Sequence, residues 1–585
     1  MTFKLYNTIT KKQQPFVPND TNSITFYTCG PTVYDDAHIG NFRSFLAADL
    51  LRRWIESPLC ALQSTEGSTH TGPRTVTHVM NITDVGHMTD DDNADGAGQD
   101  KMELAAQRIT ESKKDGSIHK AADIDPNDPR AIANFYEARF KSDAIKLGLK
   151  VAVEAESDPT LMPRASDHVN HMKQVIVELI NNDHAYTAGQ PGARAVYFNT
   201  QSFPNYGSLS GNTLDHLKGG AGGRVDDSQQ SEKKHPADFL LWKEDDTHKM
   251  KWPAPNHPDC KDWNEGYPGW HIECTAMALA RLVPGGLDAA NAKHSTIDLH
   301  SGGEDNIFPH HECEIAQSCC FTGNDSFANH WFHARFLKVE GQKMSKSKGT
   351  MYTLTDLTDK GIDPAAVRLE LIKTHYRANA DFSMQGLKDS TRRIQIWRRD
   401  AKEMMAVIND PRLNWNYTRF DRLMGFSEAM SDDLNIAGAI SVFERSRASS
   451  LFADNLDDEK EKHQLDAAVD SITLPDSPLE PAEALSVWQD ESKSDTERSL
   501  AATHVIDNIL GVIFRPLPKI QDSGIALYQP GVIPSEEIES LLAQRAEAKK
   551  AKDFAAADAI RDQLSALNLS IMDKPGGKVE VAPAN

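Results

Sequence analysis

The sequence has few cysteines, a deficit of positive charge and no long apolar run. Seven cysteines, odd in number and unevenly spread over 585 residues, argue against a disulfide framework and favour a reducing compartment. Lysine and arginine number 63 against 85 for aspartate and glutamate, so the net charge of −22 argues against binding nucleic acid by overall charge. Because no apolar run reaches about 18 residues and the first thirty residues lack a signal-like core, we expect a soluble, cytoplasmic protein with no membrane partner.

A strand, a turn and a helix are predicted close to the N-terminus. Residues 23–28 are mostly β-branched or aromatic and carry no charge, which is typical of a buried strand. A Gly-Pro pair at 30–31 ends it, and from Phe42 the apolar residues follow helical spacing. Cys29 therefore lies at the strand end and residues 38–41, His-Ile-Gly-Asn, at the helix start, where α/β sheets bind phosphate-bearing ligands. Taken alone, residues 38–41 also fit a turn with an ordinary histidine.

A lysine-rich loop at residues 343–349, Lys-Met-Ser-Lys-Ser-Lys-Gly, follows a predicted strand at 336–340. Ammonium groups on a short loop near glycine suit the binding of a polyphosphate. The two motifs together resemble the signatures of class I aminoacyl-tRNA synthetases, although the first usually ends in histidine and here ends in Asn41. The sequence Cys-Gly-Pro-Thr-Val-Tyr-Asp at 29–35 narrows the resemblance to cysteinyl-tRNA synthetases, over nearly the whole chain.

The length suggests about four domains, and 39% hydrophobic residues allow sizeable cores. The resemblance implies an α/β fold: a doubly wound, parallel, Rossmann-like sheet with a connective insertion, then an α-helical bundle and a small C-terminal domain. The expected segments are 1–125 and 255–335 for the catalytic halves, 126–254 for the insertion, 336–398 for the lysine-rich loop and stem-contact region, 399–520 for the anticodon-binding bundle and 530–585 for the C-terminal anticodon-recognition domain.

Three further stretches are interpreted from composition. Residues 88–98 are acidic and predict a solvated loop. Residues 455–498 are acidic with several prolines and predict an exposed insertion or a mobile helix-and-loop. Residues 388–402 are rich in arginine and fit either an RNA contact or a solvated helix face. In the tail, residues 574–579 lack the tryptophan that the family often has near the anticodon.

Four residues are candidate metal ligands: Cys29, Cys274, His310 and Glu314. A proline before His310 suits a first helical turn, so His310 and Glu314 project from one face at i, i+4. Two thiolates, an imidazole and a carboxylate make a zinc set, but zinc cysteines usually come in close pairs, so spacing alone also allows buried, inert cysteines. The resemblance places all four on the family's zinc positions, with Cys313 as a rival of Glu314.

The resemblance gives the zinc a purpose, since a soft metal prefers a thiolate over a hydroxyl, whereas size alone separates small side chains by only about 1–3 kcal/mol. It implies one Zn²⁺ per chain and Mg²⁺ with ATP. The implied catalytic residues are His38, Lys343 and Lys346. The implied ATP-binding residues are Gly30, Thr32, His38, Gly40, Asn41, Lys343 and Lys346. The implied substrate pocket contains Tyr34, Thr83, Trp270, His271, His300, Asp305 and His311.

The expected function is that of a cysteine–tRNA ligase, which activates L-cysteine with ATP and transfers it to tRNA(Cys), as a monomer. One alternative is a related ligase that joins cysteine to an amino-sugar in thiol biosynthesis. The long C-terminal third argues against it, because such an enzyme needs no anticodon bundle. The other is a non-catalytic RNA-binding paralogue, against which the retained signature and zinc positions argue.

Overall fold

The computed structural model describes the chain except for residues 86–87, 91–96, 116–123, 213, 215–231, 291–295, 346–348, 411–412, 414–421, 449–458, 516–520, 524–525, 529–531, 533–534, 552, 568, 574–577 and 584–585. It divides into two units. The first comprises residues 1–336, 374–380 and 424–442, and the second comprises 337–373, 381–423 and 443–585. No helix among the described residues combines the length and the apolarity that crossing a membrane requires.

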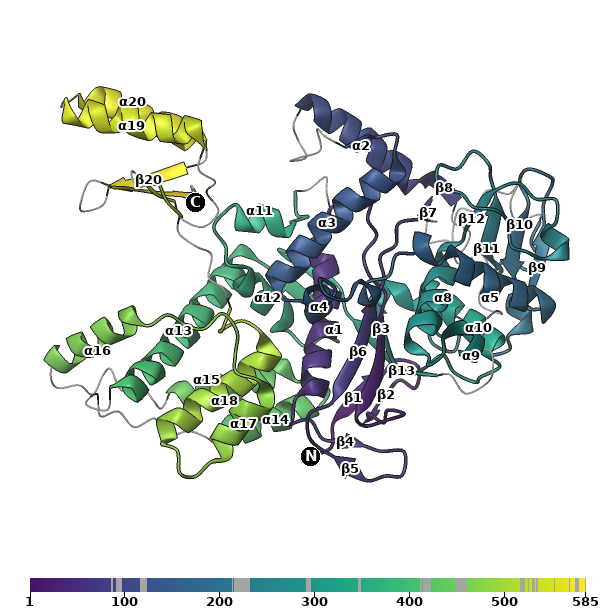
Figure 1. Ribbon diagram of the computed structural model, residues 1–585, viewed down its shortest axis with the longest axis horizontal. Coiled ribbons are helices and arrows are strands. Elements are labelled where there is room, and N and C mark those ends of the chain that lie inside the picture. The colour runs from purple at the N-terminus through teal and green to yellow at the C-terminus, as the bar shows by residue number, and fades with distance from the viewer. Residues whose placement is uncertain are drawn as a thin grey trace. The chain divides into compact units, whose positions relative to one another are not determined.

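The centre of the first unit is a four-stranded parallel sheet (Figure 1). Its strands are β3 (Ser23–Thr28), β6 (Thr75–Met80), β13 (Ile297–Gly303) and β14 (Ala328–Ala334), in the order β14-β13-β3-β6. The chain winds outward from β3 to β6 through α1 (Ile39–Glu56), and from β13 to β14 through α10 (His310–Thr322). The direction of winding changes between β3 and β13, which is where open α/β sheets bind ligands. The doubly wound α/β prediction is confirmed.

The local predictions around this sheet are confirmed closely. The strand predicted at 23–28 is β3, and the predicted helical apolar stripe lies in α1, where Phe45, Leu50 and Trp54 are buried. The predicted strand at 336–340 is β15 (Leu337–Val339) of the second unit. These elements follow from local spacing, because uncharged β-branched runs favour strands and a repeat of three to four residues favours helices.

Between β6 and β13 the chain forms a second sheet, which is antiparallel. Its strands are β9 (Ala185–Ala188), β10 (Ala195–Phe198), β11 (Phe239–Glu244) and β12 (Gly266–Pro268). The accompanying helices are α2 (Lys101–Asp115), α3 (Pro129–Leu147), α4 (Lys150–Glu154), α5 (Val169–Asn181), α8 (Trp270–Leu282) and α9 (Gly286–Ala290). Short antiparallel pairs are β1 (Lys4–Asn7) with β2 (Lys12–Pro15), and β4 (Leu62–Gln63) with β5 (Thr69–His70). The loop prediction for 88–98 is wrong at its ends, because β7 (Met88–Asp90) pairs with β8 (Ala97–Asp100); residues 91–96 lie outside the described part.

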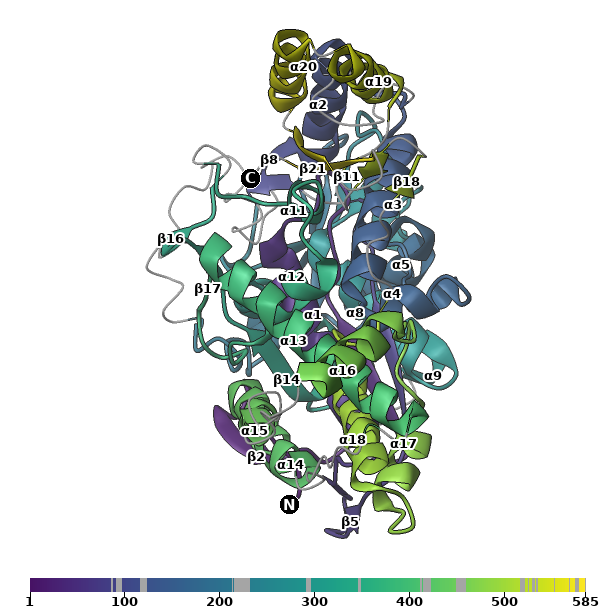
Figure 2. The same ribbon diagram turned by 90° about the vertical axis from the view of Figure 1, so that its left-hand side faces the viewer.

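The second unit is mainly helical, and Figure 2 shows its long helix α13 (Met384–Asn409). Its other elements are β16 (Gln342–Lys343), β17 (Ala380–Phe382), α11 (Leu354–Thr358), α12 (Pro364–Ile372), α16 (Glu459–Ser471), α17 (Pro481–Gln489) and α18 (Asp495–Leu510). Helices α14 (Arg422–Ser431) and α15 (Ile436–Ala448) contribute residues 424–442 to the first unit. The segment 455–498, predicted to be exposed, is mostly exposed where it is described, but it is helical in α16 and α17. Leu465 and Val469 of α16 are buried against Met404 of α13. Residues 455–458 lie outside the described part.

Arg393, Arg398 and Arg399 of α13 pair with acidic residues of the second unit. Arg398 is buried and pairs with Asp363, and Arg399 pairs with Glu403 and Asp466. Trp397, which the sequence places among them, is buried as well. Because these groups already serve packing and ion pairing, the geometry favours the structural interpretation of this stretch over an RNA contact.

The tail forms its own core in the second unit. Strands β18 (Gln521–Asp522), β19 (Ala526–Tyr528), β20 (Leu569–Asp573) and β21 (Val579–Pro583) make one sheet with helices α19 (Glu536–Lys550) and α20 (Phe554–Ala566). Tyr528 of β19 is buried together with Leu542, Leu564 and Val581. The sheet of this small domain therefore begins before residue 530. β20 and β21 pair antiparallel on either side of residues 574–577, which lie outside the described part.

Candidate metal centre and nucleotide-binding edge

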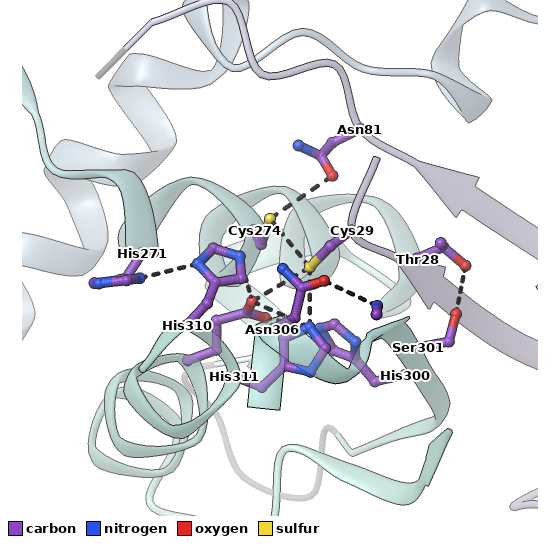
Figure 3. A network of polar contacts seen from close by, with 12 residues as sticks. Thr28, Cys29, Asn81, His271, Cys274, His300, Ser301, Asn306, His310 and His311 are labelled. Carbon is purple, nitrogen blue, oxygen red and sulfur yellow. Dashed lines mark hydrogen bonds and ion pairs between the residues drawn. The ribbon is translucent and has the colours of Figure 1, made fainter. Parts of the chain in front are cut away.

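The four predicted metal ligands converge in the first unit at the switch between β3 and β13. Figure 3 shows three of them, Cys29, Cys274 and His310, pointing toward one another. Cys29 directly follows β3, Cys274 lies in α8, and His310 and Glu314 lie one turn apart in α10. The Sγ atoms of Cys29 and Cys274 are 3.6 Å apart, and Glu314 Oε1 lies 3.4 Å from Cys29 Sγ and 2.9 Å from His310 Nε2. One donor atom from each of the four falls within 4.8 Å of the others, and all four residues are buried.

This donor set fits zinc. A tetrahedral site with Zn–S bonds of about 2.3 Å separates two sulfurs by about 3.8 Å, close to the 3.6 Å between Cys29 and Cys274. Two thiolates and an imidazole are soft or borderline ligands that suit zinc, whereas magnesium and calcium take oxygen ligands. The cluster therefore satisfies the chemistry of a four-ligand zinc site.

The remaining polar atoms of the ligands are held by neighbours. His310 Nδ1 lies 2.9 Å from His271 Nδ1, and the Trp270 ring stacks on the His310 ring at 4.2 Å between centroids. Glu314 Oε2 lies 2.7 Å from His300 Nε2. Such outer contacts fix the orientation of metal-binding side chains. Trp270, His271 and His300 thus surround the ligands, as a substrate pocket beside the metal requires.

A second grouping overlaps the first. His311 Nε2 lies 3.2 Å from Cys29 Sγ, and its Nδ1 lies 2.7 Å from His333 Nε2. Cys29, His300, His311 and Glu314 also meet within 4.8 Å, so geometry alone offers two positions that share Cys29 and Glu314. Cys313 belongs to neither grouping; its Sγ lies 3.5 Å from the hydroxyl of Tyr206.

Two ligands of the cluster favour the form that binds metal, and two favour the protonated form. Burial and the neighbouring Cys274 and Glu314 raise the pKa of Cys29 well above its usual range. Burial lowers the pKa of His310, but Glu314 and Cys274 raise it to about 10, so Cys29 and His310 must each release a proton to bind a metal. Burial by itself raises the pKa of Glu314, but the charges of His300 and His310 hold that pKa well below its usual range. Burial likewise opposes ionisation of Cys274, yet hydrogen bonding with Cys29 and His310 lowers the pKa of Cys274 to about 6. Because thiolates and carboxylates are the metal-binding forms, ionised Cys274 and Glu314 prepare the site for a cation.

The edge beside the cluster is built by two strand-end loops. Gly30 N donates to Asn81 Oδ1 at 2.8 Å, and a Cβ on Gly30 would come within 1.8 Å of the Asn81 carbonyl oxygen, so only glycine fits. Thr83 N donates to the Pro31 carbonyl at 3.0 Å, and Val33 N donates to the Thr83 carbonyl at 3.1 Å. These bonds join the loop after β3 to the loop after β6 and leave Thr32 exposed.

The unusual Asn41 closes a reciprocal cap at the start of α1. Asn41 N donates to His38 Nδ1 at 3.2 Å, and His38 N donates to Asn41 Oδ1 at 3.1 Å. Because Nδ1 accepts, the neutral His38 ring carries its proton on Nε2, which is a donor suited to a phosphate oxygen. Asparagine therefore replaces the usual histidine of the motif with a side chain that holds His38 in place, next to the half-buried Gly40.

The other predicted residues are distributed as follows. Tyr34 and Thr83 are buried near the strand ends, and Thr83 Oγ1 accepts from Asn81 Nδ2 at 3.0 Å. Asp305 is exposed on a 3-10 turn at Glu304–Ile307. Lys343 is exposed at the end of β16 in the second unit, and Lys346 lies outside the described residues.

Two residues of the site were not predicted from the sequence. Asn81 Oδ1 binds Gly30 N and also lies 3.7 Å from Cys274 Sγ, and Tyr27 is buried beside the cysteines. The sequence pattern around each of them could have identified it as a candidate. Asn81 directly follows the uncharged, β-branched run at 75–80, and Tyr27 is two residues before Cys29 and therefore on the same face of its strand.

Comparison with known proteins identifies the class first. Residues 15–392, more than half of the chain, match the catalytic domain of tRNA synthetases class I (C). Together with the doubly wound sheet and its ligand cluster, this match makes the chain a class I aminoacyl-tRNA synthetase. Residues 534–580 match the cysteinyl-tRNA ligase anticodon binding domain.

Full-length relatives then identify the family. A cysteine–tRNA ligase of Salinibacter ruber is 36% identical and the alignment covers 98% of this chain and 97% of the relative. Those of Afipia carboxidovorans and Chlorobium luteolum are 33% and 31% identical, over 100% and 99% of this chain and 100% and 98% of theirs. The chain belongs to the cysteine–tRNA ligase family, which favours that function over the amino-sugar ligase alternative.

Proposed function

We propose that this protein activates L-cysteine with ATP and transfers the cysteinyl group to tRNA(Cys). The observation that carries the proposal is the buried cluster of Cys29, Cys274, His310 and Glu314, together with the His38–Asn41 cap that follows the same strand, β3, as Cys29. A thiol-selecting site next to a phosphate-binding helix start is what cysteine activation needs. Family membership over the whole chain supports the tRNA acceptor.

In the first step the cysteine carboxylate attacks the α-phosphate of ATP, and pyrophosphate leaves as cysteinyl-adenylate forms. The nucleophile is already an anion, so no general base is needed and catalysis rests on positioning and charge stabilisation. We assign His38 Nε2–H to a phosphate oxygen, because the cap with Asn41 fixes its tautomer. From the lysine-rich motif, we assign Lys346 the role of binding the ATP phosphates, with Lys343 assisting. Gly30, Thr32 and Gly40 are assigned to contacts between the protein backbone and the nucleotide. Mg²⁺ is expected to accompany ATP.

In the cysteine pocket Cys29, Cys274, His310 and Glu314 would hold one zinc ion. That ion would supply a soft Lewis-acid position that prefers a thiolate to a hydroxyl. Trp270 and His271 orient His310, and His300 orients Glu314. His311, Thr83, Tyr34 and Asp305 are assigned to the surrounding pocket. Selection of sulfur over oxygen then needs no separate editing domain.

In the second step the cysteinyl group moves to the ribose of the terminal adenosine of tRNA. We propose that the anticodon end of the tRNA binds the helical bundle at 399–520 and the small C-terminal domain at 530–585. The domains proposed for the rest of the chain are the two catalytic halves at 1–125 and 255–335, the insertion at 126–254 and the stem-contact region at 336–398. Seven free cysteines support a cytoplasmic location, and we propose a monomer.

Charging assays with purified protein, radiolabelled cysteine, ATP and tRNA test the proposal. Acid-precipitable cysteine that depends on both ATP and tRNA is expected. Transfer to an amino-sugar but not to tRNA would favour the ligase alternative. Absence of cysteine-dependent pyrophosphate exchange would favour a non-catalytic RNA-binding protein.

A further inference from the structure

A buried tyrosine hydroxyl next to the metal cluster has no assigned role. Tyr27 lies in β3, is 0% exposed, and pairs in register with His300 of the neighbouring strand β13. It is two residues before Cys29, so both side chains lie on the same face of the sheet. Its ring meets the His300 ring edge-on at 5.3 Å between centroids, and it packs in one core with Cys29 and Cys274.

Within the described part of the chain, the Tyr27 hydroxyl has no hydrogen-bond partner. A buried hydroxyl without an acceptor is unfavourable, and buried tyrosines usually find one. A phenol is a neutral O–H donor at neutral pH whatever its surroundings. This one lies in the same buried core as the sulfurs of Cys29 and Cys274, and its ring contacts His300, which binds Glu314.

We propose that Tyr27 is a positioning residue of the metal centre, whose hydroxyl donates a hydrogen bond to the Cys274 thiolate when a metal is bound. The inference rests on the proposed function in one respect, namely that the cluster binds zinc. Asn81 Oδ1, the other polar atom near Cys274 Sγ at 3.7 Å, is an acceptor and cannot stabilise a thiolate. Cys29 and His310 also hydrogen-bond with Cys274, but both would be ligands of the metal and would no longer donate. Tyr27 is then the donor that remains for that sulfur among the contacts described above.

The negative charge of the four ligands explains why a hydrogen-bond donor beside Cys274 would matter. Two thiolates and a carboxylate bring three negative charges to a divalent cation, and a substrate thiolate would add a fourth. A neutral O–H on one thiolate withdraws electron density from the sulfur without adding charge. It thus favours acceptance of the substrate sulfur, and outer-shell donors of this kind typically change metal affinity or activity about 10–100-fold.

The test compares Tyr27→Phe with Tyr136→Phe in the full chain. Tyr136 is a matched control, because it is also buried and its hydroxyl also lacks a partner among the described residues, but it lies in α3 and is not in the metal cluster. Zinc affinity is measured by competition with a chelator, and the thiolate-to-metal charge-transfer band is recorded after replacing zinc by Co²⁺. Pyrophosphate exchange gives the KM for cysteine and for ATP.

We expect Tyr27→Phe to weaken zinc binding about 10–100-fold, to shift the charge-transfer band and to raise the KM for cysteine with the KM for ATP unchanged. Tyr136→Phe should match the wild type in all three. Wild-type affinity and an unshifted band in Tyr27→Phe would overturn the inference while leaving the proposed function intact. Wild-type protein that binds no zinc would overturn both.

If Tyr27→Phe does not fold, site-specific replacement of Tyr27 by 3-fluorotyrosine provides a nearly isosteric variant. Fluorine makes the phenol a stronger donor, so the charge-transfer band should move opposite to the shift that loss of the hydroxyl produces. An unchanged band in the folded fluorotyrosine protein would equally overturn the inference.

Discussion

The Sγ atoms of Cys29 and Cys274 lie 3.6 Å apart although 245 residues separate them in the chain. One follows strand β3 and the other lies within helix α8, and neither belongs to a closely spaced cysteine pair. The sheet edge brings them together with His310 and Glu314. The first prediction concerns this pair.

Cys274→Ser should lose most of the bound zinc, because a hydroxyl replaces a soft thiolate ligand. Discrimination between cysteine and serine in pyrophosphate exchange should then fall toward the roughly 10–200-fold that a pocket of fixed shape supplies. Cys60→Ser is the control, since Cys60 is buried away from the cluster, and it should keep both zinc and discrimination. Full zinc content in Cys274→Ser would contradict the assignment.

Glu314→Ala and Cys313→Ala distinguish the two candidates for the fourth ligand. Glu314 contacts Cys29, His300 and His310, whereas Cys313 Sγ lies near the Tyr206 hydroxyl. Metal analysis should find zinc in Cys313→Ala and little in Glu314→Ala. The reverse pattern would make Cys313 the ligand.

Asn41→Ala should remove half of the cap that holds His38. The expected loss is about 0.5–1 kcal/mol in the free energy of unfolding, as for other helix caps, together with slower ATP-dependent pyrophosphate exchange. Glu497→Ala provides a matched control, because Glu497 closes the same kind of cap on α18 with Ser494. Equal exchange rates in the two variants at equal stability would mean that the cap does not orient His38 for catalysis.

Lys346→Ala should slow adenylate formation about 100- to 1000-fold, since loss of one preorganised contact to developing charge typically costs about 2.7–4 kcal/mol. Zinc content and thermal unfolding should be unchanged. Lys338→Ala removes an exposed lysine of β15 and controls for general charge loss. Pyrophosphate exchange at the parental rate in Lys346→Ala would refute the role taken from the motif.

Deleting residues 516–585 should weaken tRNA charging but spare cysteine-dependent pyrophosphate exchange, because activation is assigned to the parallel-sheet unit. The cut falls before β18, since deletion from Ser535 would leave Tyr528 without the core that buries it. Gel filtration and circular dichroism show whether the truncated chain is folded. A folded truncation without exchange activity would contradict the modular assignment.

The sequence by itself determined the elements with strong local patterns. Strands β3 and β6 follow from uncharged β-branched runs, α1 from its apolar stripe, and the turn of α10 that sets His310 above Glu314 from the helical repeat. The two signature motifs also fixed the family. These predictions depend only on the spacing of residues that are close in the sequence. At that range the geometry of a helix or strand determines which side chains share a face.

The tertiary structure decided what depends on distant segments. It paired Cys29 with Cys274, brought His311 within reach of Cys29 and gave Asn81 its contact with Gly30. It also buried Leu465 and Val469 of α16, in a stretch that composition alone predicted to be exposed. The order β14-β13-β3-β6 sets which strand ends adjoin, and that order results from how crossover helices pack on the sheet rather than from any local pattern. A residue's partner across 245 positions is therefore fixed only when the whole sheet assembles.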